Sequence, residues 1–453
     1  MTEAWLPDLA RSSGPKYLAI ADALDAAIDR GDLSGGDRLP PQRDVAARLG
    51  VDLTTVTKAY DTARQRGLIE ARGRAGSFVR GATTAAEAED IARIDAGMNM
   101  PPELAGDMLG RAMRDTIAAL LTEGSGLRLQ YQPAGGGAAD RSAGARLIAR
   151  SGIATSDDQV IVTAGAQNAL HAILHANLRP LDAVACGRFV YSGFKALAAR
   201  LGLRLVPLLT MDGDTLRAAC RAEKIRALYL VPTNDNPTAT TLDLATRRGI
   251  ADQARADDLM VIEDDVYRAL CTAPPPPIGT FAPERSWYVA SVSKTISPAL
   301  RVAYVHAPDI GGALRLAGDV HQTAIMAPPL NAALVRTWLD DGRHDRLVEA
   351  MRREAMRRQA MAAEILDGLR YRAHPEGYHL WLELPTGADA ADLVHAMYSS
   401  GLSVVASDRF RVAPGDDQAV RVSLGGLIDP PRLVRALHLL RGHIDTRQHR
   451  SLV

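Results

Sequence analysis

Two hydrophobic patterns divide this chain into parts. Near the N-terminus, Tyr17, Ile20, Leu24 and Ile28 recur at helical spacing, which predicts an amphipathic helix. After about residue 95, continuous apolar runs alternate with longer helical patterns. The seven runs are Val160–Val162, Ala183–Cys186, Leu203–Leu209, Ala227–Val231, Leu259–Ile262, Trp287–Val292 and Val302–Val305. Because such runs are typical of strands buried on both faces, we expect an α/β fold with a seven-stranded, mostly parallel sheet wrapped by helices.

A smaller α+β lobe is expected at the C-terminal end. A charged helical pattern runs from about His344 to Leu366, and strand-like segments follow near His379–Leu384 and Ala419–Leu424. We expect this lobe to cover about residues 310–453 of a large domain that spans residues 95–453.

The first 80 residues have the pattern of a separate small domain. Pro41 suits the first turn of a helix over Gln42–Leu49, and after a short turn Asp52 can cap a third helix that ends near Arg66. Two helices joined by so short a turn predict a helix-turn-helix. Two short strands, Leu68–Ala71 and Gly76–Val79, then flank a basic hairpin or wing.

The segment after this domain is small, polar and acidic, with no apolar period until Ile91. Such a composition is typical of a connector. We therefore expect domain 1–80, a linker over 81–94 and the large domain after it.

Whole-chain composition predicts the cellular compartment but says little about the function. The 453 residues include 53 Lys+Arg and 53 Asp+Glu, so the formal net charge is zero. No apolar run approaches the roughly 20 residues that span a bilayer, and the N-terminus lacks a signal-peptide pattern. Cys186, Cys220 and Cys271 have neither metal-site spacing nor the density of a disulfide framework. We expect a cytoplasmic protein with no membrane partner.

Local charge differs from the whole-chain average. Between Ser34 and Arg80, nine basic residues stand against five acidic ones, an excess of four. Short hydroxyl side chains and a lysine early in a recognition helix can reach base edges and phosphates, and a basic wing can follow the DNA backbone. A solvated three-helix bundle is the simpler interpretation of the same charges.

Specific motifs favour the DNA-binding interpretation. The stretch from Gly35 to Ala46, with Leu49–Val51, Thr54–Val56, Ala59–Tyr60 and Gly67–Ile69, resembles the GntR-type winged helix over about residues 14–80. The resemblance implies double-stranded DNA as a partner. Its implied DNA contacts are Arg43, Thr54, Thr55, Thr57, Lys58, Arg72 and Arg74. Asp52-Leu53 stands where many members have Ser-Arg, which removes one phosphate contact.

One lysine of the large domain lies in unusual surroundings. The chain has five lysines, and Lys294 alone directly follows an apolar strand, between Ser293 and Thr295 and close to Arg301. A lysine flanked by hydroxyls and an arginine is suited to hold an aldehyde as a Schiff base beside a bound phosphate. By composition alone, a surface lysine would be the more common interpretation.

Three further motifs follow apolar strands. In Glu263–Tyr267, an acid can pair with a pyridinium nitrogen and the tyrosine can bind a ring hydroxyl, although a metal-binding acid cluster or a polar loop fits the same residues. The Asn-Pro turn at Asn236 offers an amide to the same ring oxygen. Thr163–Ala169 opens a helix whose first N–H groups can form a phosphate cradle.

Taken in this order, the four motifs resemble fold-type I pyridoxal-phosphate aminotransferases from about residue 95 to the C-terminus. With the winged helix, the whole chain resembles a MocR-type regulator of the GntR superfamily. The resemblance implies that pyridoxal 5′-phosphate is the cofactor, that Lys294 forms the Schiff base and that Asp264 pairs with the ring nitrogen. It gives the ring oxygen to Tyr267 and Asn236. The implied phosphate ligands are Ser291, Ser293, Arg301 and the amides of Ala166 and Gln167.

The resemblance also gives roles to four further residues. Tyr191 would stack on the cofactor ring, with Val266 on the opposite face. Tyr131 would reach the phosphate of a neighbouring subunit, which implies a homodimer, and Arg421 would grip a substrate carboxylate. Three departures from the family pattern affect this picture. They are Ala239 in place of a common glycine, the missing acid-proline pair in Cys186–Tyr191, and the stretch Ser423–Gly426.

Three functions are compatible with these residues. The leading hypothesis is a transcriptional regulator that senses an amino compound, or the cofactor itself, through Lys294. The alternative is an active aminotransferase with a vestigial or secondary DNA-binding domain. A cofactor-free scaffold that binds DNA and a partner protein is the third.

Overall fold

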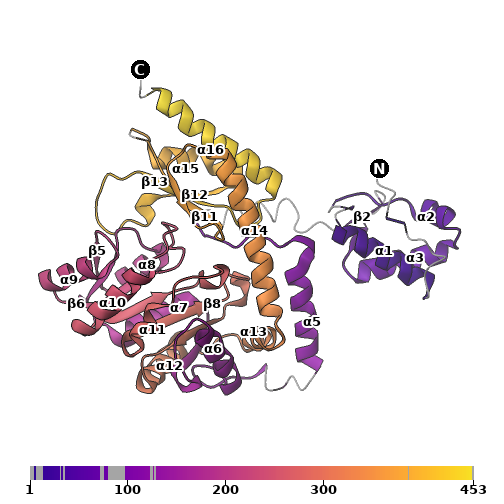
Figure 1. The fold of residues 1–453 in the computed structure, drawn as a ribbon. Helices are drawn as coiled ribbons and strands as arrows, with labels where there is room; N and C mark the ends of the chain where they lie inside the picture. The colour runs from indigo at the N-terminus through magenta and orange to yellow at the C-terminus, as the bar shows by residue number, and fades with distance from the viewer. Residues whose placement is uncertain are drawn as a thin grey trace. The chain divides into compact units, whose positions relative to one another are not determined.

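The computed structural model describes residues 5–6, 14–30, 32–33, 36–71, 76–79, 97–122, 126, 129–385 and 387–450. Contacts divide the chain into two units, residues 1–94 with 105–107 and residues 95–104 with 108–453, and each is described by itself (Figure 1). The expected linker over 81–94 and the wing residues Arg72 and Arg74 lie outside the described residues. No described helix combines the length and hydrophobicity that a bilayer span requires.

The first unit contains three helices and a two-stranded antiparallel hairpin. Their bounds are α1 Lys16–Arg30, α2 Gln42–Leu49, α3 Leu53–Gln65, β1 Ile69–Ala71 and β2 Ser77–Val79. Pro41 stands at the N-cap of α2 rather than inside its first turn. Gly50 ends α2 in the left-handed region (φ 61°), where glycine is favoured, and the chain turns at once into α3. Asp52 caps α3, since its carboxylate accepts the Thr54 backbone N–H at 2.8 Å.

The second unit is built on the predicted seven-stranded sheet. Its strands are β3 Val160–Thr163, β4 Ala183–Gly187, β5 Arg204–Leu208, β6 Ile225–Leu230, β7 Met260–Asp264, β8 Ser286–Ser291 and β9 Ala303–His306. The order across the sheet is β3-β9-β8-β7-β6-β4-β5, and only β9 runs antiparallel to its neighbours. The prediction of a mostly parallel sheet is confirmed.

Helices pack around this sheet and share three hydrophobic clusters of described residues with it (Figure 1). They are α5 Met108–Thr122, α6 Ala138–Arg150, α7 Ala166–Asn177, α8 Ser192–Arg200, α9 Gly213–Ala222, α10 Leu244–Ala256, α11 Ile278–Phe281, α12 Ile310–Ala324 and α13 Pro329–Asp341. Short 3₁₀ turns lie at Ala105–Asp107, Asp157–Gln159, Arg268–Leu270, Pro283–Arg285, Pro298–Leu300, Tyr398–Ser400 and Ser407–Arg409.

A second, antiparallel sheet forms the small lobe. Its order is β10-β11-β13-β12, and its elements are β10 Tyr371–Ala373, β11 His379–Glu383, β12 Ser403–Ala406, β13 Ala419–Ser423, α15 Ala390–Met397 and α16 Pro430–Arg450. The long helix α14, Arg343–Ile365, contacts both α13 and α16. Helices α12 and α13, which the expected lobe of 310–453 includes, pack into the clusters of the large sheet, while the small-lobe cluster starts at Ala362. We therefore propose that the small lobe starts within α14.

Candidate functional site

The large sheet brings the predicted motifs to one edge. The strands β3, β4, β6, β7 and β8 run in the same direction, and each predicted motif follows the carboxyl end of one of them. Arg301 precedes the antiparallel β9, so it lies at the same edge. Ligands of open α/β sheets bind outside the carboxyl ends of the strands.

Asp264 ends β7 with a buried carboxylate. Its Oδ2 accepts the hydroxyl of Tyr229 at 3.0 Å, while Oδ1 is buried with no hydrogen-bond partner among the described residues. Burial raises the pKa of Asp264 to about 7, against the lowering effect of the Tyr229 hydrogen bond. An acceptor of this kind is suited to a cationic N–H donor.

The acids on either side of Asp264 serve other partners. Glu263 accepts the backbone N–H groups of Ile278 and Gly279 at 2.8 and 3.0 Å, and Asp265 faces Arg268. Successive side chains of a strand point to opposite faces, which separates Asp264 from both neighbours. The three acids therefore bind separate partners, and they do not form a group of close ligand atoms among the described residues.

Lys294 and Tyr267 meet at one residue, Asn99. The Lys294 ammonium donates to the Asn99 carbonyl oxygen at 2.7 Å. The Asn99 amide donates to the hydroxyl oxygen of Tyr267 at 3.0 Å and lies 3.2 Å from Nδ1 of His379. Its Oδ1 accepts the Ser423 hydroxyl at 2.7 Å. Because the Tyr267 oxygen accepts from Asn99, its own O–H remains a donor toward the pocket.

His379 completes this network as a neutral ring. Nε2 lies 2.9 Å from the carbonyl oxygen of Asp235 and therefore carries the proton, which leaves Nδ1 to accept from Asn99. Burial lowers the pKa of His379 to about 3. The imidazole thus holds the Asn99 amide in one orientation.

Arg421 and Asn236 are paired across the two lobes. The guanidinium of Arg421 donates to Oδ1 of Asn236 at 3.0 Å and to the carbonyl oxygen of Gly97 at 2.8 Å. Both side chains are buried, and the Arg421 guanidinium lies 5.2 Å over the ring of Phe410. The backbone carbonyl oxygens of Gly97 and Asn99 therefore accept hydrogen bonds from the two cations of the predicted site, Arg421 and Lys294.

The predicted phosphate ligands form a second group at the same edge. The hydroxyls of Ser291 and Ser293 lie 3.0 Å apart, and Arg301 donates to the carbonyl oxygen of Ala164. A Cβ on Gly165 would lie 2.8 Å from Nη2 of Arg301, so glycine lets this guanidinium approach the start of α7. The first N–H groups of α7, at Ala166 and Gln167, have no acceptor within the helix.

Of the three remaining predicted residues, Val266 is buried, Tyr191 is half-buried and Tyr131 is exposed. Burial raises the pKa of Tyr191, and the nearby Asp264 raises it further, which places this phenol close to the cluster. Val266 is buried in the same core as Tyr267. Tyr131 is 81% exposed, so it does not join the cluster of its own chain.

Two departures from the family pattern have structural reasons. Ala239 adopts φ 55°, the left-handed region in which glycine is common, and its N–H donates to the Asp235 carbonyl at 2.7 Å. A Cβ on Gly425 would lie 1.8 Å from the carbonyl oxygen of Met100. Glycine at 425 therefore lets the segment that carries Asn99 pass against the end of β13.

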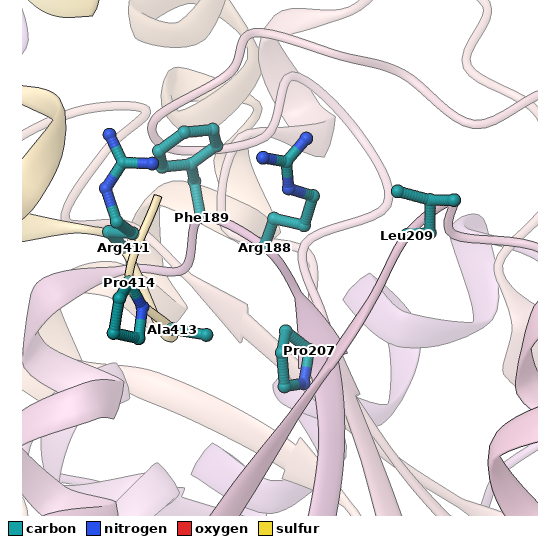
Figure 2. A pocket seen from close by; sticks show the side chains of 7 residues that line it. All are labelled: Arg188, Phe189, Pro207, Leu209, Arg411, Ala413 and Pro414. Carbon is teal, nitrogen blue, oxygen red and sulfur yellow. The ribbon is translucent and has the colours of Figure 1, made fainter. Parts of the chain in front are cut away.

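A pocket separate from this cluster lies at the third departure, the segment Cys186–Tyr191. It is lined by Arg188, Phe189, Pro207, Leu209, Arg411, Ala413 and Pro414 (Figure 2). Arg411 lies 5.2 Å over the ring of Phe189, and the Phe189 backbone bridges to residue 411. Arg188 and Arg411 both pair with Asp417. The residues after β4 thus pack against the small lobe, and both arginines already have a carboxylate.

The predicted DNA contacts divide into exposed and internally bonded side chains. Arg43, Thr54 and Lys58 are exposed, and Thr55 is half-buried. The Thr57 hydroxyl lies 2.9 Å from both Oε1 of Gln42 and the Leu53 carbonyl oxygen, so it joins α3 to α2. The Lys58 ammonium lies 4.1 Å above the ring of Tyr17.

Sequence reasoning missed Asn99, His379 and Tyr229. Asn99 stands between two methionines just after the linker, and His379 opens an otherwise apolar strand. A lone polar residue in an apolar run is a weak signal, because it does not say which partner it meets.

Comparisons with known proteins agree with this geometry. The family described as Aminotransferase class I and II matches residues 97–437, and the family described as Bacterial regulatory proteins, gntR family, matches residues 16–79. The HTH-type transcriptional regulator YdeF of Bacillus subtilis is 30% identical over 457 residues, which cover 98% of this chain and 97% of YdeF. The chain is a MocR-type member of the GntR family.

A second regulator and a solved aminotransferase structure are also similar to this GntR-family chain. The vitamin B6 salvage pathway transcriptional repressor PtsJ of Salmonella typhimurium is 26% identical, over 90% of this chain and 94% of PtsJ. The structure of the α-aminoadipate aminotransferase LysN from Thermus thermophilus, in complex with N-(5′-phosphopyridoxyl)-L-leucine, has a TM-score of 0.72 and 25% identity. It covers 82% of this chain and 96% of LysN.

The pocket of this MocR-type chain fits pyridoxal 5′-phosphate. Oδ1 of Asp264 is a buried acceptor that would suit the ring nitrogen, the Tyr267 hydroxyl would suit the ring oxygen, and Lys294 would supply the amine. Two serine hydroxyls, an arginine and a helix N-terminus at the same edge of the sheet are groups that would suit a phosphate.

Proposed function

We propose that this chain is a DNA-binding transcriptional regulator that holds pyridoxal phosphate on Lys294 and senses an amino compound there. One observation carries the proposal. A helix-turn-helix with exposed Arg43 on α2 and exposed Thr54 and Lys58 on α3 is fused to a unit whose buried donors and acceptors suit the cofactor.

The chain's own residues would act as follows. Pyridoxal phosphate, when bound, supplies an aldehyde that condenses with amines and a ring that withdraws electrons. Asp264 would keep the ring nitrogen protonated, and Tyr267, held by Asn99, would donate to the ring oxygen. Ser291, Ser293, Arg301 and the amides of Ala166 and Gln167 would hold the phosphate, with Tyr191 against the ring.

Arg421 would bind a carboxylate of the amino compound. To do so bidentately, its guanidinium would exchange the oxygens of Asn236 and Gly97 for those of the ligand. Gly97 follows the expected linker by three residues. Loss of the Arg421–Gly97 hydrogen bond would therefore change how the segment leading to the DNA-binding unit is held. A ligand can shift a conformational equilibrium only through a contact that differs between the two states, and this hydrogen bond would be such a contact.

A homodimer is part of the proposal. Tyr131 is largely exposed on its own chain and would reach the phosphate of the partner. Two winged helices would then contact paired half-sites, as symmetric DNA readers do.

The deciding experiment is a mobility-shift titration on the DNA upstream of the chain's own reading frame. The protein is measured with and without pyridoxal phosphate and with a panel of amino acids and amines, beside Lys294→Ala. We expect one amino compound to change the DNA affinity of the wild type and not that of Lys294→Ala. An affinity that no amine changes would refute sensing, and absence of any DNA binding at low salt would refute the regulator.

An active aminotransferase is the second candidate, because the full set of residues expected for amino-group transfer is present in the described pocket. Steady conversion of an amino acid and a 2-oxo acid by the purified chain, abolished by Lys294→Ala, would support it. The likeness to YdeF over nearly the whole chain, including the winged helix, favours the regulator.

A further inference from the structure

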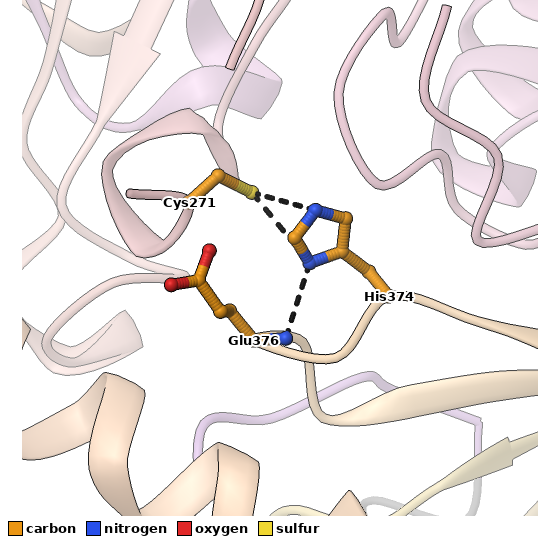
Figure 3. A group of neighbouring side chains, drawn as sticks. All are labelled: Cys271, His374 and Glu376. Atoms are coloured by element: carbon orange, nitrogen blue, oxygen red, sulfur yellow. Dashed lines mark hydrogen bonds between the residues drawn. The ribbon is translucent and has the colours of Figure 1, made fainter. Parts of the chain in front are cut away.

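We propose that Cys271, His374 and Glu376 form a binding site for one zinc ion that joins the two lobes of the second unit. Among the described residues this is the one group of such side chains whose ligand atoms all lie within 4.8 Å of one another. None of the three belongs to the cofactor pocket, and Figure 3 shows them facing a common point.

The geometry suits tetrahedral zinc. The Cys271 sulfur lies 3.4 Å from Nε2 and 3.8 Å from Nδ1 of His374. With zinc–sulfur and zinc–nitrogen bonds of about 2.3 and 2.0–2.1 Å, two ligands of one tetrahedral ion lie about 3.6 Å apart. Thiolate, imidazole and carboxylate together select zinc over magnesium or calcium, which prefer oxygen ligands.

The imidazole has a defined ligand atom. The Glu376 backbone N–H donates to Nδ1 of His374 at 3.2 Å, so Nδ1 carries the lone pair and Nε2 the proton. Zinc would replace that single hydrogen bond at Nδ1. The thiol proton of Cys271 would leave to solvent as the zinc–sulfur bond forms, and the two anionic ligands would then balance the charge of the ion.

The surrounding groups support the carboxylate. The Thr272 backbone N–H donates to Oε2 of Glu376 at 2.8 Å, and the Thr272 hydroxyl donates to Oε1. Such outer contacts orient a metal-binding carboxylate. The nearest cation, Arg352, lies 3.7 Å from Oε1 but also pairs with Glu349, so it adds little net charge.

The cluster takes its residues from both lobes, so a bound ion would connect them. Cys271 follows the cofactor residue Tyr267 by four positions in the large lobe. His374 and Glu376 lie in the turn that leads from β10 to β11 of the small lobe. Tyr378, two residues after Glu376, donates to the backbone oxygen of Lys294 at 2.9 Å. A zinc ion here would fasten the small lobe against the loop behind the cofactor.

The test is zinc retention by the full-length protein. Wild type, Cys271→Ser and the control Cys220→Ser are stripped with a chelator and dialysed against zinc, and the metal per chain is measured by mass spectrometry. We expect one zinc ion in wild type and Cys220→Ser. In Cys271→Ser we expect an affinity lower by more than about tenfold, since a ligand is lost. No zinc in wild type, or equal binding by both serine variants, would overturn the site.

Two further measurements guard against misfolding and surface binding. Cobalt in place of zinc should give thiolate-to-cobalt absorption in wild type that Cys271→Ser lacks; absorption that persists in Cys271→Ser would overturn the assignment. Glu376→Gln keeps the size of a half-buried side chain, and its circular dichroism should match the wild type while its zinc affinity falls. Because neither measurement uses DNA or an amine, their failure would leave the proposed regulator intact.

Discussion

The two candidate sites of this chain place polar groups in opposite environments. The proposed DNA contacts Arg43, Thr54 and Lys58 are exposed on the surface of the first unit. In the cofactor pocket, Asp264 and Arg421 are almost fully buried and bonded to residues far away in sequence.

The difference shows how each site can select its ligand. Exposed cations gain affinity by displacing counterions from a polyanion, which needs charge and reach more than fixed geometry. Buried donors must be paired or they destabilise the fold, so their directions are set before a ligand arrives. A substitution should therefore affect ligand binding alone at the DNA face, and both ligand binding and stability in the pocket.

The largest expected effect is that of Lys294→Ala. The variant lacks the pocket amine that the cofactor needs, so the purified protein should lose the visible absorption of bound pyridoxal phosphate. Lys224→Ala, which changes an exposed lysine, should keep it. A yellow Lys294→Ala protein would contradict the assignment of the lysine.

Asp264→Asn should change how stability depends on pH in cofactor-free protein. Burial raises the pKa of folded Asp264 from 3.8 to about 7. Between these two values the folded state keeps a proton that the unfolded state has lost, so the free energy of unfolding falls as the pH rises toward 7. At about 1.4 kcal/mol per pKa unit, wild type should lose up to about 3 kcal/mol more than Asp264→Asn between pH 5 and pH 8.

Urea unfolding at both pH values measures this difference. Glu263 is present in both proteins, so its own titration cancels. Added pyridoxal phosphate should remove the difference by pairing the carboxylate with a cation. Parallel pH profiles without cofactor would show that Asp264 is not the titrating group.

Asn99→Leu should weaken the cofactor site without unfolding the unit. It keeps the branched outline of the side chain and the backbone carbonyl but removes the amide donor to Tyr267, leaving a buried oxygen and His379 without that partner. We expect cofactor affinity to fall by about tenfold, from a cost of roughly 1–3 kcal/mol. The pH titration of cofactor absorption should also shift, whereas a shift equally large in Ser423→Ala would assign the effect to packing.

Arg43→Ala should act on DNA binding alone. Loss of one phosphate contact is expected to lower affinity several-fold and to reduce the slope of log affinity against log salt by about 1. The melting temperature should not change. Arg64→Ala, at a residue paired with Asp61, serves as the control; an unchanged salt slope in Arg43→Ala would remove this residue from the interface.

Thr57→Val should give the smallest effect, and it should lower stability rather than DNA binding. Because the Thr57 hydroxyl bonds to Gln42, the variant should lose about 1 kcal/mol of unfolding free energy in the DNA-binding unit. Its salt slope should match the wild type. A changed slope with unchanged stability would return Thr57 to the DNA contacts.

Much of the fold could be predicted because it depends on local spacing. The seven apolar runs are the seven strands of the large sheet, and helix α2 begins and ends at the predicted residues. The missed strands, β10 and β12, are short and lie at the edges of the small sheet. Three or four residues carry too little alternation to separate a strand from a loop.

The sequence by itself determined which chemical groups the chain offers and at which strand ends they stand. A strand and the turn after it are continuous in sequence, so Lys294, Asp264 and Asn236 could be placed from motifs. Only the tertiary structure decided their partners. Asn99 meets Tyr267 and His379, and Cys271 meets His374, across 168, 280 and 103 positions. Such contacts depend on how distant segments pack, which spacing along one segment does not encode.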